Sequence, residues 1–400
     1  MTTAAVADDA GRARYTYRLR VSSTAAAALE AEWARCRWIW NECVARSKKA
    51  HADGEECGPA RLDRMLTRAR RVTPWLAAGP SVPQQQLIRD FGKSRSKALK
   101  DIREGAPVWR RAGMPRYKRK RDTRSSLNYT RRGFRLEDGR LRLAGGIVVR
   151  PVWSRELPGL PSSVRVYQDG TGAWYCSFVV PAVSEQMPAT GRVIGIDWGV
   201  REVATTTCDA HDLPHPQHGR AAAQRLARYQ RQMARRGRPR GRAQSRGYQR
   251  ARLHAAKAHR KVARQRQDTA RKWAKQVVRG HDALAVEDFR LKFLTKTSMA
   301  RKVADGAIGA TKAALVEMAR KHGRDLRLVD PAHTTMDCAQ CMTRTKHALP
   351  LSERTYTCTA CGAVSPRDKN SAHVMLVRAG LNPVGADRIR LVCPLDERAA

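Results

Sequence analysis

The chain has 400 residues and a formal net charge of +42, from 78 lysines and arginines against 36 aspartates and glutamates. Its 42% of hydrophobic residues suffices for folded cores, which excludes a disordered polycation, and its length favours two or three domains. Such a charge surplus destabilises a compact protein unless a polyanion neutralises it. We therefore expect a nucleic-acid partner, with an anionic membrane surface as the alternative.

No stretch of the sequence approaches the ~20 apolar residues that cross a bilayer. The first residues also lack the basic and then apolar regions of a signal peptide. We expect a cytoplasmic protein of bacterial type, without a membrane partner, that associates with the nucleoid when bound to DNA. The sequence does not specify the oligomeric state.

The first half of the chain predicts an antiparallel β module interrupted by helices. Residues 15–21 alternate as a strand does. Helices are predicted over residues 22–49, from a Gly/Pro break near 54–59 to Leu66, and over 80–102. Residues 134–143 and 163–180 each predict a hairpin, the first around an Asp-Gly turn. We interpret 107–185 as a small antiparallel barrel or sheet that also includes the first strand.

From residue 191 onward, strands alternate with helices, which predicts an α/β fold. The expected strands are 193–197, 202–207, 283–289 and 326–330, and the expected late helices are about 305–322 and 369–380. Between Gly219 and Gly280 there are 21 lysines and arginines and a single acid. Apolar residues at helical spacing predict two long basic helices there, broken at 235–242.

Four cysteines form two closely spaced pairs near the end of the chain. Cys338 and Cys341, and then Cys358 and Cys361, are each separated by two residues, with sixteen residues between the pairs. Two such turns bring four thiolates within tetrahedral reach of one zinc ion. Because four cysteines leave no position for water, we predict a structural zinc; the alternative is four unliganded thiols.

Three acids are candidates for a catalytic metal site. Asp197 ends one apolar strand, Glu287 ends another, and Asp368 opens a helix just past the cysteines. Hydrolysis of phosphodiesters by Mg²⁺ requires such hard oxygen ligands. Each acid also has a purely structural interpretation: Asp197 could start a turn, Glu287 could be a solvated strand end with Asp288 as its rival, and Asp368 could be an N-cap.

The order of these features resembles that of the TnpB/OrfB family of transposon-encoded proteins, and equally of the compact type V CRISPR effectors similar to them. "GIDWGVREVATT" and "AVEDFRLKFL" resemble the first and second motifs of the family's RuvC-like nuclease fold. "LSERTYTCTACGAVSPRDKNSAHVMLVRAG" resembles the run from the second zinc knuckle into the third motif. Met342 departs from the glycine that the family usually has after the second cysteine.

The resemblance implies an α/β multidomain protein: an RNase H-like (RuvC-like) nuclease domain with a zinc ribbon, plus a wedge-like antiparallel β-barrel with an inserted helical bundle. The implied segments are the first wedge strand (1–22), the helical recognition insert (23–106), the rest of the wedge module (107–188), the RuvC-like domain with its basic helices (189–336, helices 219–280), the zinc ribbon (337–363), and the third motif with the C-terminal tail (364–400).

The resemblance further implies that Asp197, Glu287 and Asp368 bind catalytic Mg²⁺ or Mn²⁺. The implied activity is RNA-guided cleavage of DNA, with a guide RNA and double-stranded target DNA as partners. Two other functions stay open: guided or unguided DNA binding without cleavage, and a transposase that performs strand transfer.

A run of arginines lies at the break between the two basic helices. It comprises Arg235, Arg236, Arg238, Arg240 and Arg242. Because no acids are interspersed among them, we expect contacts with the nucleic-acid backbone, which carry no sequence information. The alternative is a solvated helical face.

Overall fold

The computed structural model describes residues 11–120, 124–239, 242–288, 299–345, 350 and 352–381. The chain divides into two compact units, Gly11–Ala182 and the part from Val183 onward. Among the described residues, no helix is both long enough and apolar enough to cross a membrane.

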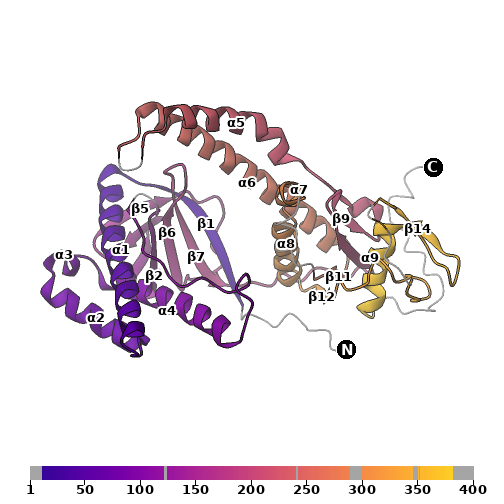
Figure 1. Ribbon diagram of the computed structural model, residues 1–400, viewed down its shortest axis with the longest axis horizontal. Helices are drawn as coiled ribbons and strands as arrows, with labels where there is room; N and C mark the ends of the chain where they lie inside the picture. The colour runs from indigo at the N-terminus through magenta and orange to yellow at the C-terminus, as the bar shows by residue number, and fades with distance from the viewer. Residues whose placement is uncertain are drawn as a thin grey trace. The chain divides into compact units, whose positions relative to one another are not determined.

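The first unit contains a seven-stranded antiparallel sheet (Figure 1). Its strands are β1 (Arg12–Arg20), β2 (Ser126–Thr130), β3 (Phe134–Glu137), β4 (Arg140–Leu143), β5 (Ile147–Pro151), β6 (Ser163–Gln168) and β7 (Trp174–Pro181), in the order β2-β6-β7-β1-β5-β4-β3. β1 pairs along most of its length with β7 and, through Leu19 and Arg20, with β5. The sheet therefore curls into a near-closed barrel, which confirms the predicted antiparallel module.

Both predicted hairpins are present in this sheet. β3 and β4 join through Asp138 and Gly139, whose φ angles of 50° and 69° are those of the tight turn that Asp-Gly favours. β6 and β7 pair across the second predicted turn.

Helices occupy the chain between β1 and β2, as predicted. They are α1 (Ser23–Ala52), α2 (Pro59–Val72), α3 (Pro74–Ala77) and α4 (Ser81–Arg103), and a 3₁₀ turn, η1 (Arg131–Gly133), follows β2. Ser22 caps α1 by accepting a hydrogen bond from the Ala25 amide at 3.1 Å. α2 continues six residues past the predicted Leu66, up to the residues before Pro74.

The second unit is built on a mixed five-stranded sheet. Its strands are β8 (Val193–Trp198), β9 (Glu202–Thr206), β10 (Leu213–Pro214), β11 (Ala283–Glu287) and β12 (Asp325–Val329), in the order β10-β9-β8-β11-β12. β8, β11 and β12 run parallel to one another. β9 pairs antiparallel with β8, and β10 pairs antiparallel with β9 at the edge of the sheet. The central strands are continuous apolar runs because helices cover both of their faces.

The helices of this unit are α5 (His218–Arg236), α6 (Arg246–Gly280), α7 (Ala300–Gly306), α8 (Ile308–Lys321) and α9 (Arg367–Arg378), with a 3₁₀ turn, η2 (Asp209–His211), and a small hairpin of β13 (Thr355–Thr357) and β14 (Val364–Pro366). Ile194, Ile196, Leu284 and Val286 pack against α6 and α8, whereas Ala285 packs against α9. The predicted helix 305–322 is two helices, because Ala307 has a φ of 55° and interrupts the first.

Candidate functional site

Two of the three predicted acids lie side by side at one end of the mixed sheet. The last paired residues of β8 and β11 are Ile196 and Val286, so Asp197 and Glu287 follow next in register. Adjacent strands lie about 4.8 Å apart. Because side chains alternate along a strand, both acids point away from α6 and α8 and toward the face that α9 covers.

Helix α9 brings the third acid to the same end of the sheet. Gly195 of β8 lies so close to α9 that a Cβ atom there would overlap the carbonyl oxygen of Ala372. Asp368 precedes Ala372 by four residues, about one helical turn, and so lies on the same side of α9. The glycine therefore explains how the helix that carries Asp368 reaches the strand that carries Asp197.

The three acids form one electrostatic cluster. Burial raises the pKa of Asp197 well above its usual value, and the neighbouring charges of Glu287 and Asp368 raise it further. Burial also raises the pKa of Glu287 to about 7, although the Trp198 amide donates to its Oε2 at 3.2 Å. Burial and the neighbouring negative charges favour the protonated form of Asp197, whereas a cation bound beside it would favour the ionised form.

The structural alternatives for two of these acids are wrong. Pro366 occupies the N-cap position of α9, so Asp368 is not the cap and lies in the first turn. Asp288, the rival of Glu287, forms an ion pair with Lys312 at 2.6 Å and is 44% exposed, whereas Glu287 is 6% exposed.

The four predicted cysteines meet as a metal-binding group. Their sulfur atoms all lie within 4.8 Å of one another, with 3.7 Å between Cys338 and Cys361 and 3.6 Å between Cys341 and Cys358. Tetrahedral zinc with Zn–S bonds of ~2.3 Å requires sulfur separations of roughly 3.8 Å. Among the histidine, cysteine, aspartate and glutamate side chains of the described residues, these four cysteines are the one group of three or more close enough together to bind an ion. The three acids do not form a second group of this kind.

Each cysteine pair is closed by the same backbone turn. The Met342 amide donates to the Cys338 carbonyl at 2.9 Å, and the Gly362 amide donates to the Cys358 carbonyl at 3.0 Å. Met342 and Gly362 both have left-handed backbones, with φ angles of 57° and 72°. Met342 thus adopts the conformation that glycine usually supplies, and the departure from the family pattern leaves the geometry of the first turn intact.

The cysteine module is attached directly to α9 by residues that the sequence analysis missed. Buried Asn370 donates from Nδ2 to the Asp337 carbonyl at 2.7 Å and accepts from the Ala339 amide at 3.0 Å. Arg378 donates to the Ala332 carbonyl at 2.6 Å and to the carboxylate of Asp337. Asn370 is two residues from Asp368, so the metal module and the third acid share one turn of helix.

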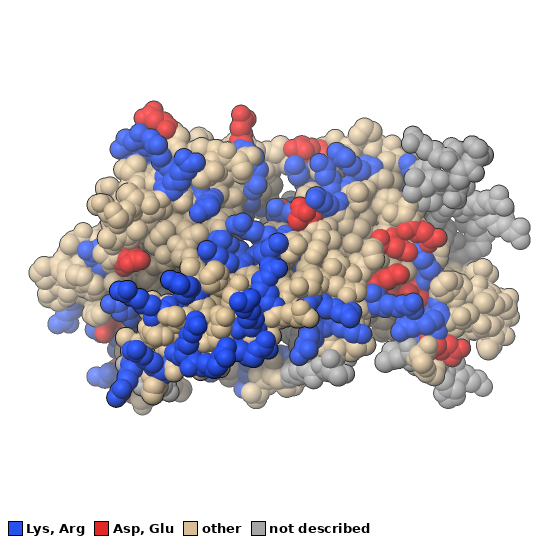
Figure 2. Space-filling view, turned by 90° about the horizontal axis from the view of Figure 1, so that it is seen from above, with Lys and Arg blue, Asp and Glu red and all other residues tan. Residues whose placement is uncertain are grey.

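The predicted arginine run lies where α5 and α6 meet. Arg235, Arg236, Arg238 and Arg242 are all exposed. Arg236 also donates to the Gly247 carbonyl in the first turn of α6, and Arg238 donates to the Ala243 carbonyl in the connecting turn, both at 3.3 Å. Arg240 lies outside the described residues. Figure 2 shows lysine and arginine side chains gathered on the face seen from above.

Fold and site together define a class of protein. It is a basic α/β protein with acids clustered at the end of a mixed sheet, a four-cysteine site of the kind that binds zinc, and a separate β-barrel unit.

Two segments of the chain match models of known protein families. Residues 176–298 match the OrfB_IS605 family, described as a probable transposase, and residues 309–375 match the Cas12f1-like TNB domain. The first match contains Asp197 and Glu287, and the second contains the cysteines and Asp368. Over these two segments the chain is similar to the OrfB_IS605 (TnpB) family and to the Cas12f1-like TNB domain.

Two relatives align over most of their own length. A Streptomyces pristinaespiralis protein, provisionally named an RNA-guided DNA endonuclease, is 28% identical over 375 residues, which cover 92% of this chain and 89% of the relative. InsQ of Escherichia coli (strain K12), named in the same way, is 25% identical and covers 85% of this chain and 86% of its own. A solved Cas12f1–sgRNA–target DNA complex shares the fold, with a TM-score of 0.57 at 12% identity over 90% of this chain and 83% of that chain.

Proposed function

We propose that this chain is an RNA-guided DNA endonuclease that cleaves its target by metal-dependent hydrolysis. The proposal rests on Asp197 and Glu287, which follow next in register on adjacent strands, and on Asp368, whose charge acts on Asp197. The names of the two full-length relatives support the RNA-guided activity.

The fold assignment belongs to the same proposal. Counted in chain order within the second unit, the strands of the sheet stand in the order third, second, first, fourth and fifth. With the first, fourth and fifth strands parallel, this order supports an RNase H-like, RuvC-like nuclease domain. We assign the first unit as the wedge-like barrel with its helical recognition insert, with the domain boundaries given above.

The three carboxylates are the ligands that we assign to Mg²⁺ or Mn²⁺. Bound there, the metal would supply Lewis-acid chemistry for the attacking water and the leaving oxygen. Trp198 fixes Glu287 for this role, since its backbone amide and its indole N–H donate to the Glu287 carboxylate and carbonyl, both at 3.2 Å. Gly195 keeps α9, and with it Asp368, close to β8.

The remaining assignments concern structure and partners. We assign zinc to the four cysteines as a structural ion, because four thiolates leave no position open for water. We assign the guide RNA and the double-stranded target DNA as partners, held through their backbones by basic surfaces such as the one at the α5–α6 turn.

The test is cleavage of a target plasmid in Mg²⁺ by protein co-expressed with the RNA that flanks its gene. Asp197→Asn and Glu287→Gln should each lower the cleavage rate by about a thousandfold, because the metal supplies several kcal/mol of barrier reduction. Asp288→Asn is the matched control and should cut like the parent protein.

Three results would contradict the proposal. One is an intact rate in Asp197→Asn. Another is guided binding without any cleavage by the parent protein, as expected of a DNA-binding regulator. The third is joining of cut ends to new DNA, as expected of a transposase.

A further inference from the structure

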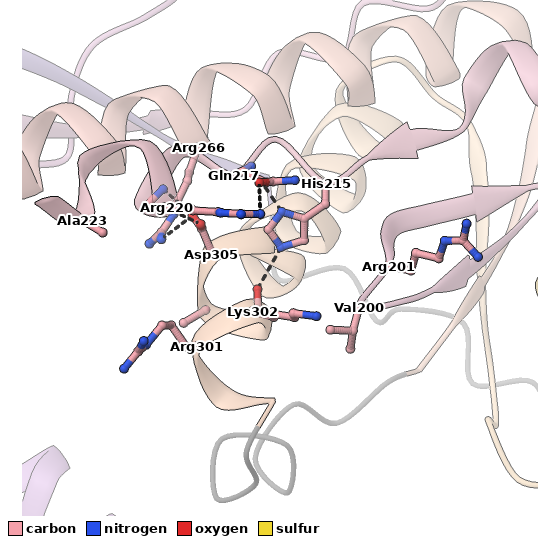
Figure 3. Close-up of a pocket in the computed structure, with 12 residues that line it drawn as sticks. Val200, Arg201, His215, Gln217, Arg220, Ala223, Arg266, Arg301, Lys302 and Asp305 are labelled. Carbon is pink, nitrogen blue, oxygen red and sulfur yellow. Dashed lines mark hydrogen bonds and ion pairs between the residues drawn. The ribbon is translucent and has the colours of Figure 1, made fainter. Parts of the chain in front are cut away.

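A basic cavity lies in the second unit beside the strand that carries Asp197 (Figure 3). Its volume is about 610 Å³, within the range of small-ligand sites. The wall is formed by the β8–β9 turn, the start of α5, the middle of α6 and helix α7. Val200, in that turn, is three residues after Asp197, so their Cα atoms are at most about 11 Å apart.

The lining of this cavity is strongly cationic. It includes Arg201, Arg220, Arg266, Arg301 and Lys302, and Asp305 is its single acid. Asp305 is already fully engaged: it accepts hydrogen bonds from the Gly219 amide at 2.6 Å, the Arg220 amide at 2.9 Å and the Arg266 guanidinium at 2.8 Å. These bonds cap α5 and hold the pKa of Asp305 below its usual value. The ionised carboxylate therefore stabilises the wall of the cavity.

Several of these cations lack a partner. Within the described residues, the side chains of Arg201, Arg301 and Lys302 make no hydrogen bond or ion pair. The Nε atom of Arg266 is buried and also has no hydrogen-bond partner there. The three unpaired cations repel one another across the cavity, and an anion bound there would pair with them.

The cavity is also held in shape and is only partly polar. The Lys302 carbonyl lies 3.0 Å from Nε2 of His215, and the Gln217 amide donates to Nδ1 of the same ring at 3.2 Å, which links α7 to the start of α5. Val200, Ala223 and Ala304 add an apolar surface. The combination suits a phosphate with an attached sugar and base better than a bare inorganic ion.

We propose that this cavity binds a backbone phosphate, with its nucleoside, of the DNA strand that is cut. The proposal rests on the proposed nuclease function and adds the position of the strand. At the 3.4 Å rise per nucleotide of B-DNA, the upper limit of about 11 Å between Asp197 and Val200 corresponds to about three nucleotides, so we place the bound phosphate within a few nucleotides of the scissile one.

The experiment measures binding of a fluorescent single-stranded DNA oligonucleotide by anisotropy, in an Asp197→Asn background that does not cut. Arg201→Gln and Arg301→Gln should each weaken binding about tenfold and reduce the slope of log K against log salt by about 1. Arg279→Gln, an exposed cation at the end of α6 outside the cavity, is the matched control and should leave both unchanged. Circular dichroism melting checks that the variants are folded.

The outcomes separate this proposal from the proposed function. If the cavity variants bind DNA like the control, while Asp197→Asn abolishes cleavage by the parent protein, the cavity proposal is overturned and the nuclease stands. If the parent protein does not cut DNA but the cavity variants lose DNA affinity and salt dependence, the phosphate site is supported and the proposed nuclease function is contradicted. If ATP raises the melting temperature of the parent protein but not of Arg301→Gln, with DNA binding unchanged, the cavity is a free-nucleotide site and the proposal is overturned.

Discussion

Gly195 is the residue on which the approach of α9 to β8 depends. A side chain at this position would meet the backbone of Ala372, which cannot rotate away, so the helix would have to move. We predict that Gly195→Ala destabilises the protein by about 1–3 kcal/mol, as overpacked cores do, and lowers the cleavage rate because Asp368 is displaced. Thermal unfolding and plasmid cleavage measure the two effects.

Gly92 offers a control for that substitution. It lies inside α4 with open space around its Cα, so Gly92→Ala should leave cleavage unchanged and stabilise the helix by about 0.5–1 kcal/mol. Equal cleavage rates for Gly195→Ala and Gly92→Ala would show that the close packing at Gly195 does not position the acid.

Met342 carries a left-handed backbone in the first cysteine turn. This conformation costs a residue with a side chain about 1–2 kcal/mol. Met342→Gly should therefore raise the unfolding free energy by about 1 kcal/mol after the added flexibility of the unfolded chain is subtracted. The melting temperature and the rate of zinc release to a chelator measure this effect. Faster zinc release from Met342→Gly than from the parent protein would contradict the prediction. Gly362→Ala should lower the melting temperature, because it places a side chain on a left-handed backbone.

The raised pKa values of Asp197 and Glu287 predict a pH-dependent stability without metal. Since both folded-state pKa values exceed the unfolded ones, the folded state favours the protonated acids, and stability falls as pH rises from about 4 through about 7. Asp197→Asn removes part of this cost. The melting temperature of Asp197→Asn should approach that of the parent near pH 4 and exceed it by several degrees at pH 8.

Added Mg²⁺ should narrow that difference at pH 8, because it stabilises the parent protein. Identical melting curves for the two proteins at pH 8 without Mg²⁺ would show that burial and the neighbouring charges do not disfavour the ionised form of Asp197.

At the scale of elements, the cysteine module and the third acid are joined through α9. Asn370 bridges Asp337 and Ala339, so Asn370→Ala leaves a buried carbonyl and a partly buried amide unpaired at a cost of about 1–3 kcal/mol. We predict that Asn370→Ala and Cys358→Ser lower cleavage at least tenfold while oligonucleotide affinity changes less than twofold. Equal loss of binding and cleavage would mean that the module contacts nucleic acid itself.

Sequence patterns predicted most elements because the signals are local. Alternation over residues 15–21 located β1, Asp-Gly located the first hairpin, and cysteine spacing located both turns of the metal site, whereas β2 and β5 were not predicted individually. The break between α7 and α8 was not predicted, although the Asp305–Gly306 pair directly before Ala307 is a common signal of a turn. The two-residue strand β10 is too short for any periodicity to detect.

The candidate site was predictable only in part, for the same reason. Asp197, Glu287 and Asp368 stand at the ends of recognisable elements, and the family resemblance singled them out. The roles of Gly195 and Asn370 arise from contacts between segments that are distant in the chain, which one sequence cannot reveal.

At the scale of the whole molecule, the net charge of +42 and the cluster of acids are complementary features. The basic surfaces attract a polyanion along its length, whereas the acids would repel its phosphates unless cations lie between them. The central claim is therefore that divalent cations bind where Asp197, Glu287 and Asp368 converge.

Titration of Mn²⁺ into the zinc-loaded protein, followed by electron paramagnetic resonance, tests this claim most directly. We predict saturable Mn²⁺ binding to the parent protein, loss of that binding in Asp197→Asn and in Glu287→Gln, and no change in Asp288→Asn. Undiminished Mn²⁺ binding in both Asp197→Asn and Glu287→Gln would contradict the assignment of these acids as metal ligands.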